Sequence, residues 1–295
     1  MERLSGLAFA GLIRALGLLS LTWQRRLGRL LGSLAWRLGG YSARITRINL
    51  ERCFPELDAP ARGRIGRLSL QHAAMLLTEM GTLYHWPVED WRRLATSIEG
   101  EDLLRGRPDD DRGVLILVPH FGNWEFLALV LGQYAVTALY DPPRQAALEP
   151  LIRGARSRAG ANMLPIDAAG LRGFYHALRS GAVTALLPDQ VPERRGGVYA
   201  PFFGWPVLTM TFAHRLLRRC DARVVFGAAL RCEGGFDVRF SEADAAIGDP
   251  DPVVSATAMN AAIESLIRTD PAQYQWEYKR FKRPPPGTPT PYPRR

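Results

Sequence analysis

From residue 112 onward, short apolar runs alternate with amphipathic segments, and this alternation constrains the fold more than any other feature of the sequence. Short continuous apolar runs are typical of buried strands, and apolar residues at spacings of three and four are typical of helices. We expect strands at 114–118, 135–140, 162–166, 183–187, 224–230 and 236–240, and helices at 124–131, 148–158, 171–180, 209–220 and 255–268. Strands that alternate with helices predict an α/β fold with a largely parallel central sheet flanked by helices.

The amino-terminal segment predicts an association with a membrane. Residues 4–23 are about as long as the ~20 residues that cross a bilayer core, but Arg14 lies among them. A charge at mid-membrane is costly, so a tilted span, an interfacial helix and a helix of a soluble core all stay open. Residues 27–38 place leucines against arginines at helical spacing, which suits a helix on a membrane surface or one packed on the domain. We expect membrane-associated helices at 1–40, a folded domain at 41–283 and a flexible Pro-rich tail at 284–295.

The net charge of +9 favours an anionic partner, which could be a membrane surface, nucleic acid or an acidic protein. Arginines at 25–52 follow the apolar segment, which predicts a cytoplasmic location for the body of the protein. Aromatic and basic residues interleave only near the carboxyl terminus, and no nucleic-acid-binding module is recognisable, so no nucleic-acid partner is expected. The three cysteines lack the spacing of a metal site, so we expect reduced thiols and no metal.

His120 and Glu125 lie where the strand expected at 114–118 meets the helix expected from residue 124. Asn123 is a good helix cap, and Gly122 permits a tight turn. Ligands bind at this junction in open α/β sheets, outside the carboxyl ends of the strands. We expect the Glu125 carboxylate to hydrogen-bond one nitrogen of His120, so that the other can take a proton from a substrate hydroxyl. The spacing alone also permits a buried histidine beside an acid at a helix start.

Motifs of several other enzyme classes are missing from the sequence. It contains no GxSxG elbow, no Walker A loop and no GxGxxG after a strand. These absences argue against a serine hydrolase, an NTPase and a dinucleotide-dependent enzyme. A base without its own nucleophile predicts direct transfer of a group to a bound hydroxyl.

Five motifs in order along the chain resemble the late acyltransferases of lipid A biosynthesis, which use acyl carrier protein thioesters. They are "RINLERCFPEL" at 47–57, "PHFGNWE" at 119–125, "LLPDQ" at 186–190, "PFFG" at 201–204 and "YKRFKRPP" at 278–285. The resemblance covers nearly the whole chain. It implies a fold like that of the glycerolipid acyltransferases and a location on the cytoplasmic face of the inner membrane.

The resemblance also implies a set of site residues. The family's catalytic His/Glu dyad falls on His120 and Glu125. A functional arginine is implied after the next helix, where "GARSRAG" offers Arg156 and Arg158, of which Arg158 aligns better. The acidic residue of the "PDQ" turn falls on Asp189.

Other candidate residues would bind the substrate. Arg158, or a turn amide at Gly122 and Asn123, is expected to face the developing oxyanion. Lys279 and Arg280 lie beside aromatic residues near the carboxyl terminus and are candidates for binding phosphate, since arginine holds phosphate bidentately. They could equally be the solvated end of a helix.

The sequence therefore predicts an enzyme that moves a fatty acyl chain from acyl carrier protein to a hydroxyl of a lipid A precursor. No cofactor is expected, because the thioester donor is already activated. The expected partners are acyl carrier protein, the lipid A precursor and anionic membrane lipid. One alternative is acyl transfer to another glycolipid or a phospholipid, although the "EGTRS"-like block of glycerol phosphate acyltransferases is absent. The other is a non-catalytic basic protein that binds membranes or nucleic acid.

Overall fold

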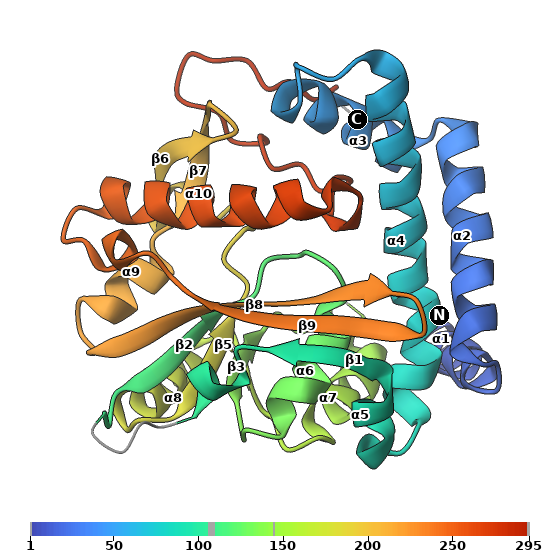
Figure 1. The fold of residues 1–295 in the computed structure, drawn as a ribbon, viewed down its shortest axis with the longest axis horizontal. Helices are drawn as coiled ribbons and strands as arrows, with labels where there is room; N and C mark the ends of the chain where they lie inside the picture. Colours follow the sequence, from blue (N-terminus) through green and yellow to red (C-terminus); the bar gives the residue numbers. More distant parts are fainter. Residues whose placement is uncertain (1, 106–109, 144, 294–295) are drawn as a thin grey trace.

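The computed structural model describes residues 2–105, 110–143 and 145–293 (Figure 1). Its helices are α1 (Glu2–Gly17), α2 (Leu21–Leu38), α3 (Tyr41–Cys53), α4 (Ala59–His85), α5 (Trp91–Leu94), α6 (Trp124–Gly132), α7 (Glu149–Ser157), α8 (Ala168–Arg179), α9 (Phe212–Leu217) and α10 (Pro252–Thr269). Its strands are β1 (Ala95–Glu99), β2 (Gly113–Leu117), β3 (Thr137–Tyr140), β4 (Asn162–Pro165), β5 (Val183–Leu186), β6 (Gly197–Phe202), β7 (Trp205–Met210), β8 (Ala222–Cys232) and β9 (Gly235–Glu242).

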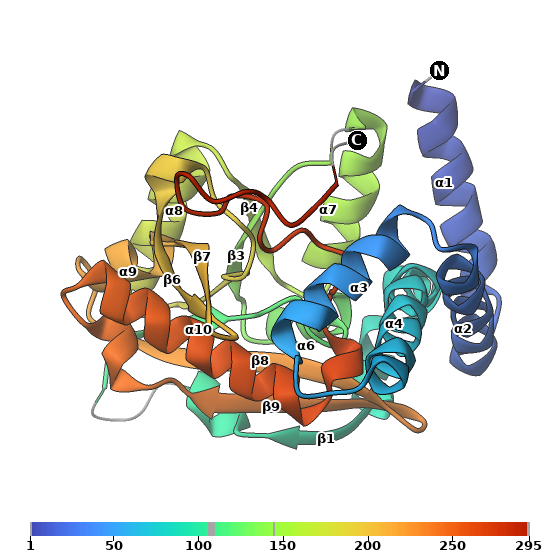
Figure 2. The ribbon, with the colours of Figure 1, turned by 90° about the horizontal axis from the view of Figure 1, so that it is seen from above.

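A seven-stranded sheet in the order β1-β9-β8-β2-β5-β3-β4 forms the centre of the fold. Strand β2 pairs in parallel with β5 and β8, and β3 pairs in parallel with β4 and β5. Only β8 and β9 pair antiparallel within this sheet. All five residues of β2 are buried, because α6 covers one face of the strand and α10 lies on the other side of the sheet (Figures 1 and 2). The predicted α/β class and the largely parallel sheet are confirmed.

The six strands expected from the sequence are all present, with ends shifted by a few residues. Three further strands escaped prediction. Strand β1 is a half-exposed edge strand without an apolar run, and β6 and β7 form a separate antiparallel hairpin. Phe203 and Gly204 connect this hairpin with positive φ angles of 48° and 74°, which is the conformation of a tight hairpin turn. The helix expected at 209–220 begins only at Phe212, because β7 extends to Met210.

The amino-terminal segment is divided into two helices, so the expectation of one helix over 4–23 is wrong. Helix α1 ends at Gly17, and Ser20 has an extended backbone at the start of α2. Both helices pack along α4, and Gly28 and Gly32 of α2 lie against the α4 backbone. No helix within the described residues is long and apolar enough to cross a bilayer.

The carboxyl-terminal segment returns to the body of the protein and is held there at Tyr292. This side chain is buried, and its hydroxyl donates to Asn49 Oδ1 over 2.5 Å. The hydroxyl also accepts a hydrogen bond from the backbone N–H of Phe281. The tail expected to be flexible is therefore anchored up to Tyr292, and residues 294–295 lie outside the described residues.

Candidate active site

The turn between β2 and α6 carries the candidate residues at the carboxyl edge of the sheet. Asn123 caps α6 as predicted, because its Oδ1 accepts a hydrogen bond from the Phe126 N–H over 2.9 Å. Gly122 has a φ of +71°, and a Cβ atom on it would lie 2.1 Å from the carbonyl oxygen of Ala229. Only glycine fits at this position, since both the backbone angle and the close approach exclude a side chain.

Asp189 is the carboxylate that holds His120. Its Oδ1 lies 2.7 Å from His120 Nδ1, and its Oδ2 accepts the backbone N–H of His120 over 2.9 Å. Asp189 follows β5, the parallel neighbour of β2, and is only 2% exposed. Burial alone would raise the pKa of Asp189, but the charge and hydrogen bonds of His120 lower it below its ordinary value. An ionised Asp189 fixes the tautomer with the proton on Nδ1, which leaves Nε2 as the basic nitrogen.

Glu125 does not bind His120, which corrects the pairing expected from the sequence. Its carboxylate receives two hydrogen bonds from Arg156, over 3.0 Å from Nε and 2.5 Å from Nη2. The Tyr84 hydroxyl donates a third hydrogen bond to Glu125 over 3.3 Å. Burial would lower the pKa of Arg156, but the charge of Glu125 raises it. The first turn of α6 directs Glu125 toward α7 and α4, whereas the segment after β5 supplies the partner of the histidine.

The structure brings Arg156, and not Arg158, to the site. Arg156 reaches Glu125 from the last turn of α7. Arg158 follows that helix and donates to the backbone carbonyl of Trp86 over 2.5 Å, at the end of α4. Our preference for Arg158 is therefore wrong, because two residues correspond to about 200° of helical rotation and place the side chains on different faces.

The backbone amides of the turn are already engaged within the protein. The Gly122 N–H donates to Gln273 O over 3.0 Å, and the Asn123 N–H donates to Ala229 O over 2.7 Å. Neither amide is free to hold an oxyanion, so that expectation is also wrong. Their contribution is to fix the turn that carries His120.

A buried network of charged side chains, with Glu79 at its centre, also holds this turn in place. Glu79 of α4 is fully buried and receives hydrogen bonds from Arg25 of α2 and Arg231 of β8 over 2.7 and 2.8 Å. The side-chain amide of Asn123 donates to Glu79 over 2.7 Å, and Arg231 donates to the carbonyl of Gly122 over 3.1 Å. One carboxylate thus joins two amino-terminal helices, the sheet and the turn.

Replacing Glu79 with Gln is expected to lower the free energy of unfolding by about 3–5 kcal/mol, because two buried arginines lose their counter-ion. Urea denaturation measures the change. Glu56→Gln is the matched control, since Glu56 pairs with Arg268 where both side chains are about half exposed. That variant should lose less than about 1 kcal/mol. Equal losses in the two variants would contradict a structural role for the network.

A cavity of about 520 Å³ opens beside the histidine. The polar residues that line it include His120, Glu125, Arg156 and Gln190. Its walls are mostly apolar side chains from α6, β3, β4 and the segments after β5 and β7, and they include Trp124, Leu127, Ala128, Leu131, Val136, Ala138, Met163, Ile166, Leu187 and Phe212. The basic nitrogen of a fixed histidine and a long apolar space therefore share one site.

Gln190 is a site residue that the sequence reasoning missed. Its Nε2 lies 3.1 Å from His120 Nε2, so the amide N–H can donate a hydrogen bond to the basic nitrogen. Tyr84 was missed as well, because nothing in a long apolar helix marks one tyrosine as a partner of Glu125. Gln190 does lie within the "LLPDQ" motif, directly after Asp189, and that position was a usable signal.

The candidate phosphate-binding residues lie elsewhere. Arg280 is 3% exposed and donates to the carbonyl of Leu208, to Thr209 Oγ1 and to Asn260 Oδ1. A guanidinium that is this buried, with both Nη atoms donating inside the protein, cannot bind an external phosphate, so the prediction for Arg280 is wrong. The ammonium group of Lys279 lies over the rings of Tyr41 and Tyr292, and its proposed role stays a prediction.

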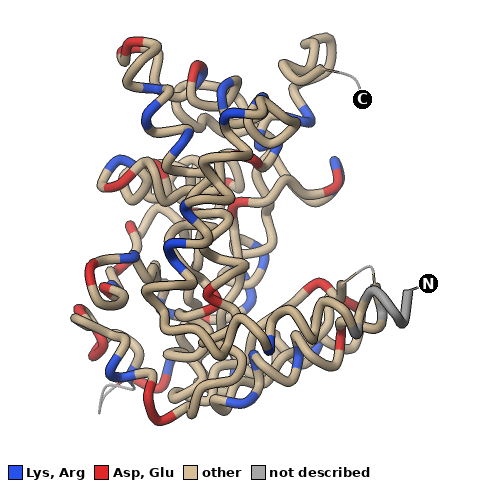
Figure 3. Tube along the Cα trace, turned by 90° about the vertical axis from the view of Figure 1, so that its right-hand side faces the viewer, with Lys and Arg blue, Asp and Glu red and all other residues tan. Residues whose placement is uncertain are grey.

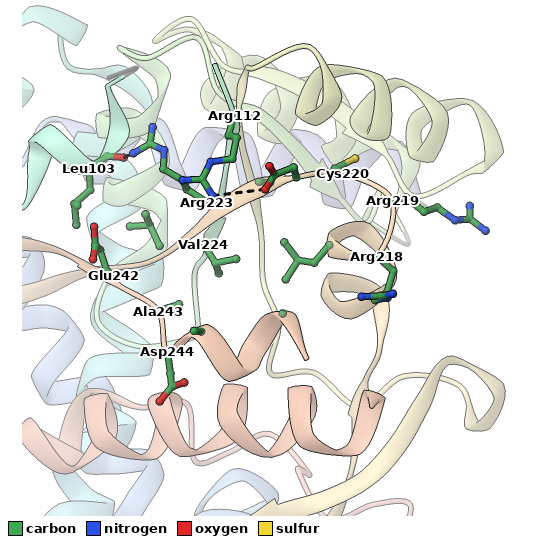
Figure 4. A pocket seen from close by; sticks show the side chains of 16 residues that line it. Leu103, Arg112, Arg218, Arg219, Cys220, Arg223, Val224, Glu242, Ala243 and Asp244 are labelled. Atoms are coloured by element: carbon green, nitrogen blue, oxygen red, sulfur yellow. Dashed lines mark hydrogen bonds and ion pairs between the residues drawn. The ribbon is translucent and has the colours of Figure 1, made fainter. Parts of the chain in front are cut away.

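A second cavity, of about 770 Å³, lies at the other ends of the strands, away from His120 (Figure 4). It is lined by the amino end of β8 and the segment after β9. Arg218 and Arg219 project on the opposite side of this cavity from Leu103 (Figure 4). It lies at the amino ends of β2 and β8, whereas ligands in parallel sheets bind at the carboxyl ends, so it is not the candidate active site.

Comparisons with known proteins agree with the motif resemblance. A family model described as bacterial lipid A biosynthesis acyltransferase matches residues 4–283. The chain is 30% identical over 273 residues to the lipid A biosynthesis lauroyltransferase of Escherichia coli K12, covering 90% of this chain and 88% of that protein. It is 30% identical over 264 residues to the palmitoleoyltransferase of the same organism, covering 88% and 85% of the two chains. The E. coli lipid A biosynthesis myristoyltransferase is 26% identical over 279 residues, covering 90% and 83%.

Proposed function

This chain belongs to the bacterial lipid A biosynthesis acyltransferases, and from that membership we propose that it transfers a fatty acyl chain from acyl carrier protein to a hydroxyl of a lipid A precursor. That it is an acyltransferase follows from the family. The donor, the acceptor hydroxyl and the mechanism are our proposal. One observation carries it: a histidine fixed by a buried aspartate faces an apolar cavity large enough for an acyl chain.

In the proposed reaction, His120 Nε2 removes the proton from the acceptor hydroxyl as its oxygen attacks the carbonyl carbon of the thioester. The Nδ1 proton stays on His120, and Asp189 stabilises the imidazolium that forms. The tetrahedral intermediate then collapses, and the carbon–sulfur bond breaks. The thiolate of the carrier leaves with the proton from Nε2, so the histidine returns to its starting state. No acyl-enzyme forms in this scheme.

We propose that the side-chain amide of Gln190 stabilises the oxyanion of the tetrahedral intermediate. This amide is 3.1 Å from His120 Nε2, where the acceptor hydroxyl has to dock, so substrate displaces it by a short distance. The displaced N–H group can then donate to the carbonyl oxygen as negative charge develops. Arg156 has further N–H groups besides the two that donate to Glu125. We propose that Glu125 orients Arg156 so that these groups bind a polar group of the acceptor.

The apolar walls support binding of the acyl chain along α6. Trp124, Ala128 and Leu131 line the cavity at spacings of four and three, so they mark one face of the helix. This face extends over about 10 Å, at 1.5 Å per residue. We propose that Leu131 and Val136, which line the cavity where α6 ends and β3 begins, form its far end.

Replacing Ala128 with Phe is expected to shorten the preferred acyl chain, and Leu131→Ala is expected to lengthen it. A ring at Ala128 fills the middle of the channel, whereas removal of the Leu131 side chain opens its end. Each excluded methylene forfeits about 0.8 kcal/mol, or about fourfold in kcat/KM. Competition among acyl donors of different length, read by mass spectrometry of the product, measures both shifts. An unchanged preference in both variants would contradict this path for the chain.

We propose that the protein acts on the cytoplasmic face of the inner membrane and that the outer face of α2 lies on the bilayer. Trp23, Leu30 and Leu34 are 56%, 66% and 50% exposed, and their spacing places them on one helical face. Arginine and lysine positions recur on the side of the molecule that α2 occupies (Figure 3). Exposed leucines beside basic residues are typical of helices that bind anionic lipid surfaces.

The double variant Leu30→Asp/Leu34→Asp is expected to lose at least about tenfold in affinity for vesicles that contain phosphatidylglycerol. Burying a leucine in an apolar phase contributes about 1.5–3 kcal/mol, so the loss of two should exceed this bound. Vesicle flotation measures the bound fraction. Val253→Asp/Val254→Asp is the control, because these valines are similarly exposed on α10, away from α2 (Figure 2). Equal losses in both double variants would count against α2.

The function as a whole is tested by incubating the purified full chain with acyl carrier protein thioesters and a lipid A precursor. We expect a product heavier by one acyl group and cleaved by base as an ester. A strain that lacks the gene should make lipid A without one secondary acyl chain, as read by mass spectrometry. An unchanged lipid A profile, with acylation of another glycolipid or a phospholipid, would redirect the proposal to that acceptor.

A further inference from the structure

Exposed arginines lie next to the cavity, where the segment after β5 meets α9. Two of them, Arg194 and Arg195, line a separate surface hollow together with Arg283. Pro192 and Gly196 line the cavity, and Arg194 and Arg195 lie between them in a short 3-10 turn, η4 (Arg194–Gly196). Arg215, on the neighbouring helix α9, lines the same cavity. The turn is joined to the start of α9 because the Thr211 N–H donates to Gly196 O over 3.0 Å. We name Arg194, Arg195 and Arg215 the arginine rim.

The side chains of the arginine rim are available to a partner. All three residues are exposed, and none forms an ion pair with another described residue. Among the residues that the structure describes, their side chains form one hydrogen bond, from Arg194 Nη1 to the Tyr199 hydroxyl over 2.7 Å. The nearby acid Glu193 is already paired with Arg283. Charges that are unpaired at the mouth of a cavity attract an anionic partner and accelerate its association.

The position of the rim decides which anionic partner it fits. The other rim of the cavity, at α7, lies beside α1, because Gly6 contacts Ala147 just before α7. Helices α1 and α2, with the exposed leucines, are at one end of the molecule, and α9 and β6 are at the other (Figure 2). A lipid acceptor has to approach from the α1–α2 end, where the bilayer is proposed to lie. The rim therefore suits a partner that arrives from solution.

We propose that the arginine rim is the docking surface for acyl carrier protein, a small acidic protein that presents its acyl group on a flexible arm. The inference rests on the proposed function, since it requires a carrier-bound donor. A carrier seated on η4 and α9 is adjacent to the gap between Gln190 and Arg215, through which its thioester reaches His120. The acceptor enters from the opposite rim, so the two substrates do not compete for one entrance.

The test compares two donors that carry the same acyl chain, one on acyl carrier protein and one on pantetheine. Arg194→Glu/Arg195→Glu is expected to lower kcat/KM for the protein-bound donor by at least about tenfold, and to leave the pantetheine donor within about twofold. The effect should shrink as salt is raised, because exposed charges are screened. Arg218→Glu/Arg219→Glu is the matched control, since this exposed arginine pair borders the other cavity (Figure 4). It should leave both donors unchanged.

Four results would overturn the docking surface. They are an unaffected rim variant beside an active wild type, an equal loss with both donors, an equal loss in the control pair, and a rise in KM for the lipid acceptor in place of the donor. The last result would assign the rim to acceptor phosphates. If the wild-type chain transfers no acyl group from either donor, the proposed function itself fails, and the docking surface fails with it. If the wild type transfers the acyl group and the Arg194→Glu/Arg195→Glu variant is as active with the protein-bound donor, only the docking surface is contradicted.

Discussion

The His120→Ala variant is expected to lose about 10²- to 10⁴-fold in kcat, the usual contribution of a general base. The hydrogen bond from the backbone N–H of residue 120 to Asp189 survives the substitution, so the turn should keep its conformation. The measurement is the initial rate of transfer from a labelled acyl carrier protein thioester to the lipid A precursor. The KM values should change far less than kcat, since the imidazole acts on the reacting atoms.

His176→Ala controls for the loss of a histidine as such, because His176 is exposed on α8 and outside the cavity. It should retain wild-type activity. Circular dichroism and urea denaturation of both variants establish that they are folded. Residual activity of folded His120→Ala above about a tenth of the wild type would remove the histidine from the mechanism.

The Asp189→Asn variant is expected to lose at least about 10²-fold in kcat, because an amide cannot stabilise the imidazolium and can favour the wrong tautomer. Asp189 acts only through His120, so adding Asp189→Asn to His120→Ala should cost nothing more. Steady-state rates of the two single variants and the double variant measure this. A further loss in the double variant would show that Asp189 acts elsewhere.

Glu125→Gln distinguishes the two carboxylates. Glu125 is bound to Arg156, so Glu125→Gln and Arg156→Gln should be strongly non-additive with one another, with a coupling of about 1–3 kcal/mol. Both should lower activity further in the His120→Ala background, because they act independently of the histidine. If Glu125→Gln has no added effect there, and Asp189→Asn does, the dyad expected from the sequence is right and the observed pairing is not the one used in catalysis.

The lowered pKa of Asp189 also predicts a pH dependence of stability. The carboxylate, which faces His120, Arg280 and Tyr274, contributes stability above the unfolded pKa of about 3.9 and loses it as the pH falls through its lower folded pKa. The wild type should therefore be more stable than Asp189→Asn near neutral pH. This difference should shrink below about pH 4 in urea denaturation curves.

The sequence sufficed for those parts of the fold and site that depend on local patterns. The buried strand β2, the cap at Asn123 and the glycine turn follow from residues that are adjacent in the chain. The family resemblance added Asp189 and the arginine pair at 156 and 158 as candidates, because motifs preserve residue types. Neither source gave the partner of each side chain.

The two carboxylates, Glu125 and Asp189, show why the sequence did not reveal the partner of each side chain. Glu125 is five residues from His120, but the first turn of α6 directs it to Arg156 and Tyr84. Asp189 reaches the histidine from the segment after β5, the strand that pairs in parallel with β2. Arg280 looked like a free basic residue in the sequence, and burial between β7 and α10 made it structural.

The amino-acid sequence alone therefore determined the α/β class, the turn that carries His120 and the enzyme family. Only the tertiary structure decided which acid holds the histidine, where the acyl cavity lies and which arginines surround it. The physical reason is that strand and helix periodicity is a property of neighbouring residues, whereas hydrogen bonds and cavities form between segments that the sheet order brings together.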